Sequence, residues 1–159
     1  MADHDALGAY CNDHRAGATA VVNLLERLAA AEHTIVARTD LDELRRSIED
    51  ELARLEEFMD RRGITRDPTR VAAGWVGEKA SRLRLSEVVT GSSAVSQLLE
   101  LETVAVGIQG KQCLWQALRA AGVDGDELDL DELLRRAHDQ AEQVEGWRRA
   151  AADAALSTS

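Results

Sequence analysis

A single proline in 159 residues is the feature that most constrains how this chain folds. Proline disrupts helix interiors because it lacks a backbone N–H and its ring clashes with the preceding turn. Little else in the sequence would interrupt a helix, and apolar residues recur at steps of three and four along most of its length. That period is typical of helices with one buried face. We therefore predict an all-α protein that folds as one domain over residues 1–159.

Four long helices are predicted, at about 5–32, 40–63, 93–121 and 129–156. Asp40 with Glu43 has the spacing of a capping box at the start of the second, and Asp129 caps the last. Gly63 and Gly122 are expected to end the second and third. The pair at 67–68, Asp followed by Pro, is typical of a helix start and predicts a short extra helix over 68–87.

The connections decide between two topologies. The links within the first and the last pair of long helices are short, whereas residues 64–92 are numerous enough to return the chain along the bundle. We therefore favour two antiparallel hairpins, joined by a crossover that contains the short helix, over a plain up-and-down bundle. This layout resembles the ferritin-like superfamily, which implies that connectivity. Shorter stretches are similar to those of uncharacterised bacterial helical proteins, and that similarity implies no activity: they are residues 12–17, 78–83 and 110–118.

A ferritin-like di-metal centre requires Glu-x-x-His on two helices, because this spacing points both ligands at the same ions. The sequence contains no Glu-x-x-His. An irregular iron or manganese site would have to use other residues, and the candidates are His14, Glu51, Glu102, His138 and Glu142. The alternative, which we favour, is that no cofactor binds, that His14 is a core histidine and that His138 and Glu142 form a surface pair.

The segment 93–121 is predicted to be the most buried helix, since Glu100, Glu102 and Lys111 are its only charges between 94 and 118. Gly107 and Gly110 each cost a helix roughly 1 kcal/mol relative to alanine. Close approach of another helix would explain them, and the alternative is that they lie at exposed positions without a packing role. A second pair with the same spacing, at 74 and 77, predicts that the short helix docks there.

Lysine is rare: Lys79 and Lys111 are the only two, and both fall in helices predicted to be buried. A buried ammonium has to be paired or neutral. We expect a structural polar core comprising Glu78, Lys79, Glu100 and Lys111, with Glu102 as a further possible partner. A functional amine in a pocket is the alternative.

A net charge of −10 would repel a phosphate backbone or an anionic membrane, so neither is an expected partner. No signal-like or membrane-spanning apolar stretch is seen, and we expect a cytoplasmic protein. Cys11 and Cys113 are expected to be buried, reduced thiols.

Three classes of function remain open. The favoured one is a non-enzymatic bundle that forms a homodimer or binds a protein partner, because the 93–121 helix needs more cover than its neighbours readily supply. The second is an oxidase that uses iron or manganese, which metal analysis of the purified protein would identify. The third is a carrier of a small apolar ligand, with pocket walls that include Trp75, Trp115 and Trp147.

Overall fold

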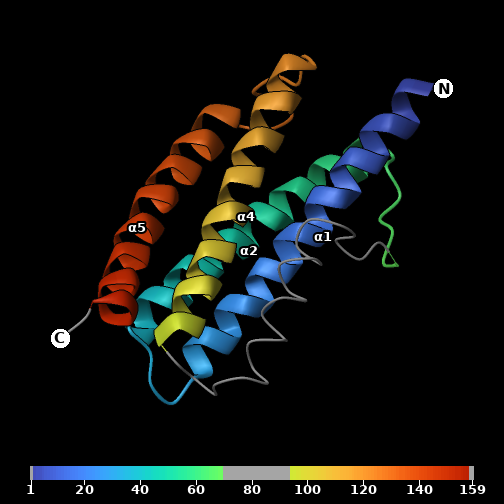
Figure 1. The fold of residues 1–159 in the computed structure, drawn as a ribbon. Helices are drawn as coiled ribbons and strands as arrows, with labels where there is room; N and C mark the ends of the chain where they lie inside the picture. Colours follow the sequence, from blue (N-terminus) through green and yellow to red (C-terminus); the bar gives the residue numbers. More distant parts are fainter. Residues whose placement is uncertain (1, 70–93, 158–159) are drawn as a thin grey trace.

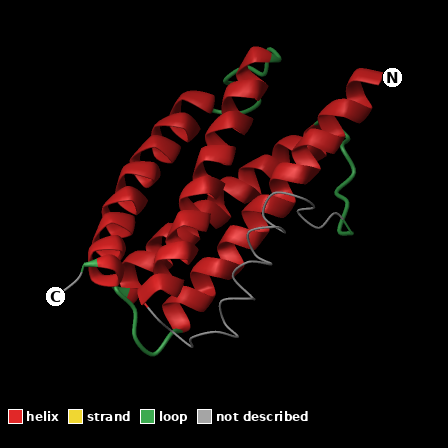
Figure 2. Ribbon diagram, in the orientation of Figure 1, coloured by secondary structure: helices red, strands yellow, loops and turns green. Residues whose placement is uncertain are grey.

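The computed structural model describes residues 2–69 and 94–157, and within these ranges the chain forms helices and connections without strands (Figures 1 and 2). The four helices described are α1 (Ala2–Ala30), α2 (Arg38–Arg61), α4 (Ala94–Ala120) and α5 (Leu130–Leu156). The all-α prediction and the four long segments are confirmed. The short helix predicted over 68–87 lies outside the described residues, apart from the turn at Pro68 and Thr69.

Most of the predicted helix ends are confirmed. Asp129 caps α5 by accepting a hydrogen bond from the backbone N–H of Glu132 at 3.1 Å. Gly63 and Gly122 follow α2 and α4 in the left-handed region, with φ of 65° and 83°. The capping box at Asp40 is wrong, because α2 begins two residues earlier and its N-cap, Ala37, has no capping side chain. The carboxylate of Asp40 instead lies in the first turn, where its negative charge interacts favourably with the positive end of the helix dipole.

Contacts at the two ends of the molecule define the helix directions. The side-chain amide of Gln97, at the start of α4, bonds the backbone of His33 and Ile35 in the α1–α2 connection, at 2.8 Å in each case. At the opposite end, Arg62 follows α2 and bonds Glu127 in the α4–α5 connection at 2.6 Å. Thus α2 and α4 run in one direction, and α1 and α5 run in the other (Figure 1). Among the described helices, α1 packs on α2, α4 on α5, and α1 on α4.

The apolar core consists of two clusters stacked along the bundle. One includes Val21, Ile48, Ile108 and Val144, and the other includes the residues Leu55, Leu114, Trp115, Leu133 and Ala137. Glu51, Lys111 and Gln140 occupy the sequence positions between the two clusters on α2, α4 and α5. A polar layer therefore crosses the core at mid-height.

Gly107 marks a close approach between α4 and α1. A methyl group at this position would overlap Cγ2 of Val21, a core residue of α1. The sequence correctly predicted that a neighbouring helix approaches here, and the described neighbour is α1. The predicted docking of the short helix through Gly74 and Gly77 lies outside the described residues.

The two cysteines differ in burial. Cys11 is buried, as predicted, and burial raises the pKa of its thiol to about 11. Cys113 is exposed, which corrects the prediction that both thiols are buried. The reason is that α4 buries Leu114 and Trp115, and residue 113 falls on the other side of the helix. Among the helices that the structure describes, none combines the length and apolarity needed to cross a membrane.

Candidate functional site

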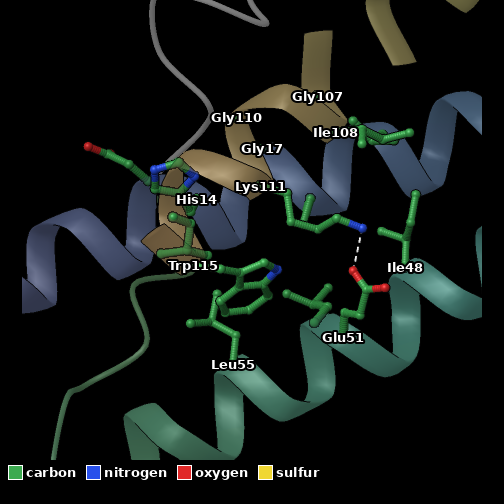
Figure 3. A pocket seen from close by; sticks show the side chains of 15 residues that line it. His14, Gly17, Ile48, Glu51, Leu55, Gly107, Ile108, Gly110, Lys111 and Trp115 are labelled. Atoms are coloured by element: carbon green, nitrogen blue, oxygen red, sulfur yellow. Dashed lines mark ion pairs between the residues drawn. The ribbon is translucent and has the colours of Figure 1, made fainter. Parts of the chain in front are cut away.

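The polar layer is built around an ion pair between Lys111 Nζ on α4 and Glu51 Oε2 on α2 (Figure 3). The Glu51 side chain is 1% exposed and that of Lys111 is 11% exposed. Both charges are thus removed from water, and each depends on the other for compensation. Lys111 Nζ also donates a hydrogen bond to Oε1 of Gln140 on α5.

Two residues of α5 make the remaining polar contacts of the Glu51 carboxylate. Gln140 Nε2 donates to Glu51 Oε1 at 2.7 Å and to Ser47 Oγ at 3.0 Å. Arg136 Nε lies 3.4 Å from the same Oε1, and its Nη1 bonds Asp50 Oδ2 at 2.8 Å. The layer therefore joins α2, α4 and α5 in one hydrogen-bonded network, in which the carboxylate of Glu51 meets two cations and an amide.

Burial and charge act in opposite directions on Lys111. Removal from water lowers the pKa of its ammonium group, the Glu51 carboxylate raises it, and the nearby Arg136 guanidinium lowers it slightly. The net direction is downward, so loss of the Glu51 charge would lower the pKa of Lys111 further.

A cavity of about 380 Å³ adjoins the ion pair and is lined by residues of α1, α2 and α4 (Figure 3). Most of its wall is apolar side chains and glycines, among them Val21, Ile48, Leu52, Leu55, Ile108, Leu114, Gly17, Gly107 and Gly110. The polar residues on the wall are Asp13, His14, Glu51, Lys111 and Trp115. A largely apolar cavity with a few polar groups is the usual form of a small-molecule site.

Trp115 contributes a buried hydrogen-bond donor to the wall of this cavity. Its side chain is 1% exposed, and its indole Nε1 has no hydrogen-bond partner among the residues that the structure describes. Figure 3 shows the nitrogen on the side of the ring that faces Lys111 and Glu51. Buried polar groups are nearly always hydrogen-bonded, so this donor distinguishes the cavity from an ordinary packing defect.

His14 lies at another part of the cavity wall, beside Tyr10, with the two ring centroids 4.6 Å apart. Burial lowers the pKa of His14, and the neighbouring carboxylate of Asp13 opposes that shift. The imidazole is therefore held in its neutral form near neutral pH. It can offer one donor and one acceptor to a molecule in the cavity.

Of the candidate metal ligands, His14 and Glu51 line the same cavity, and the other three lie elsewhere. His138 Nε2 lies 3.6 Å from Glu142 Oε1, but both side chains are on the surface, 67% and 73% exposed. Glu102 is 3.9 Å from Arg148, and Glu51 is committed to Lys111. Within residues 2–69 and 94–157, no group of three or more His, Cys, Asp or Glu side chains is arranged to hold a metal ion.

The described residues include two members of the predicted polar core, Glu100 and Lys111, and they do not pair with each other. Lys111 is buried and ion-paired, but its carboxylate partner in the structure is Glu51, while Glu100 lies 3.6 Å from Arg27 on α1. Glu78 and Lys79 lie outside the described residues. Gln140 and Arg136 were missed altogether.

One signal could have identified Glu51. The buried residues of α2 recur at steps of four and three, and position 51 falls on that series: Leu44, Ile48, Glu51, Leu55, Phe58. A negative charge on the buried face of one helix predicts a positive charge on a neighbouring helix, because a buried charge needs compensation. Lys111 is the lysine of α4 and could have been recognised as that partner.

The fold and this site define an all-helical protein with a largely apolar cavity beside an ion pair in the core. Comparison of the chain with protein-family models, with curated proteins and with solved structures finds no match.

Proposed function

We propose that this protein binds a small molecule with an apolar body, without catalysis, in the cavity between α1, α2 and α4. The observation that carries the proposal is a largely apolar cavity of about 380 Å³, with a buried indole N–H on its wall that has no hydrogen-bond partner among the described residues. The charged groups beside it are already paired with one another. They support the wall and leave the apolar surface to contact the ligand.

The connectivity supports a ferritin-like arrangement as part of this proposal. Two hairpins whose middle helices, α2 and α4, run in the same direction are what that superfamily's crossover requires. The proposed ligand is not iron or manganese, because Glu51 is ion-paired with Lys111. His138 and Glu142 are both exposed to solvent.

Self-association is a second candidate function, favoured by large apolar side chains at the surface. Val95 and Leu99, four residues apart on α4, are 45% and 39% exposed, and Ile35 is 37% exposed. The occupant we propose for this surface is a second copy of the chain, which would form a homodimer. Isolated exposed apolar residues are common, but neighbours at this spacing share one face of a helix.

The neutral dye N-phenylnaphthylamine tests the ligand-binding proposal, because its fluorescence rises in apolar surroundings. We expect saturable binding to the parent protein. Ala18→Phe would place a ring in the cavity, since Ala18 is on its wall, and should weaken dye binding by about tenfold or more. Ala53→Phe, at an exposed position of α2 away from the cavity, is the matched control.

Circular dichroism and melting temperature would establish that both variants are folded. The proposal is contradicted if the parent protein shows no saturable dye binding, or if Ala18→Phe binds the dye as tightly as Ala53→Phe.

A further inference from the structure

We infer that the ligand is an uncharged carbonyl compound, such as an apolar ketone, whose oxygen accepts a hydrogen bond from Trp115 Nε1. This inference rests on the proposed binding function and specifies the chemistry of the ligand. Three features of the cavity support it: a donor with no partner among the described residues, the paired charges around Glu51, and the apolar wall.

The donor determines which atom the ligand presents. The indole N–H of Trp115 can donate but not accept, so only an acceptor can satisfy it. With 1% of the side chain exposed and no protein partner for Nε1 among the described residues, the group loses its bond to water on folding and gains nothing in return. A ligand oxygen at this position would restore that bond.

The charges around the cavity determine that the ligand is neutral. The positive charge of Lys111 is compensated by Glu51, and Arg136 is shared between Asp50 and Glu51. A carboxylate ligand would add a buried negative charge beside Glu51, and Lys111 and Arg136, the described cations that contact Glu51, are already paired. An ammonium ligand would likewise face Lys111. A carbonyl oxygen supplies an acceptor without either cost.

The walls determine the rest of the molecule. Val21, Leu52, Leu55 and Leu114 present branched aliphatic side chains to the cavity. An aliphatic body therefore replaces water there with favourable contacts. The ligand class is thus an aliphatic body with one uncharged acceptor.

Three compounds of equal carbon number test this inference: dibutyl ketone, nonane and nonanoate, each measured by displacement of N-phenylnaphthylamine at pH 8. Trp115→Phe keeps an aromatic ring and removes the N–H. We expect this variant to lose about fivefold in affinity for dibutyl ketone, within the range of about 2- to 12-fold that one neutral hydrogen bond contributes. Its affinity for nonane should change less than twofold. Trp147→Phe, on α5 and outside the cavity wall, should leave both affinities unchanged.

Nonanoate completes the test, because the parent protein should bind it at least tenfold more weakly than dibutyl ketone. Nonane controls for damage to the cavity in Trp115→Phe, because it contacts the walls without using the donor. The inference is overturned if ketone and nonane lose affinity equally, if the variant retains full affinity for the ketone, or if nonanoate binds more tightly than the ketone. Failure of the parent protein to bind the dye or any of the three compounds overturns the proposed function instead.

Discussion

At the scale of single residues, the main polar feature of the core is the ion pair between Lys111 and Glu51. Glu51 is buried and Lys111 is nearly so, and each is held by groups from other helices. A buried pair adds little stability over an apolar substitute, but removing one member leaves an uncompensated charge in the core. The loss of stability caused by a substitution here therefore depends on whether the remaining charge is left without a partner.

Lys111→Met should lower the free energy of unfolding by about 3 kcal/mol, because it strands the Glu51 carboxylate. This is the low end of the usual range, since Gln140 and Arg136 continue to contact that carboxylate. Combining Lys111→Met with Glu51→Gln removes both charges and should restore most of the loss. Urea denaturation of the two variants measures both effects.

Arg135→Met provides the control for this experiment. Arg135 makes ion pairs with Glu132 and Asp139, but these lie on the surface of α5, where water screens them. No measurable change in stability is expected. If Lys111→Met were as stable as the parent protein, the pair would not be structural.

At the scale of secondary-structure elements, α4 is the helix that touches both its hairpin partner and α1. It reaches α1 through Gly107, where a side chain would overlap Val21. Glycine weakens the helix itself, so its presence reflects packing rather than helix propensity. The same close approach brings α1 into the wall of the cavity.

Gly107→Ala should destabilise the protein by about 1 kcal/mol. Alanine favours the helix by up to about 1 kcal/mol, but overpacking against a core residue typically costs about 1–3 kcal/mol, and the stiff, buried Val21 cannot rotate away freely. A double-mutant cycle with Val21→Ala should show that the two substitutions together cost less than the sum of their separate effects.

Gly146→Ala is the matched control, because Gly146 lies inside α5 and nothing lies within 4 Å of the added methyl group. It should stabilise the protein by about 0.5–1 kcal/mol through helix propensity alone. Thermal unfolding that gave the two alanine variants the same sign of change would contradict close packing at Gly107.

At the scale of the whole molecule, the polar layer divides the core into two apolar clusters and spans three helices. Such a layer restricts how far the helices can slide along one another, because any shift would leave Glu51 without its partners. It also lies beside the cavity, so the groups that align the helices define one of its walls.

If a second copy of the chain covers the face of α4 that carries Val95 and Leu99, the protein is a homodimer, and sedimentation velocity should show a dimer that dissociates on dilution. A variant with Val95→Ser and Leu99→Ser should shift this equilibrium towards the monomer, whereas substitution of the exposed Leu156 at the end of α5 should not. A mass corresponding to a monomer at all concentrations would exclude the dimer.

Local patterns were sufficient to predict the helices of the described residues. Apolar periodicity located all four, and glycine and Asp129 located several of their ends, because these features depend on residues within one or two turns. The Asp40 prediction failed for a similarly local reason: several residues at this helix start can satisfy the spacing of a capping box, and the sequence does not show which backbone N–H groups are left free.

Sequence alone predicted that this protein is helical, that Lys111 would belong to a structural polar core, and that Gly107 would lie where another helix approaches closely. Only the tertiary structure decided that the partner of Lys111 is Glu51, that Gln140 and Arg136 join the pair, and that Trp115 Nε1 lies beside a cavity with no hydrogen-bond partner among the described residues. The physical reason is that helix periodicity specifies which face of a helix is buried but not its height or rotation relative to a helix far away in sequence. Ion pairs and cavities depend on that relative placement to within about an ångström.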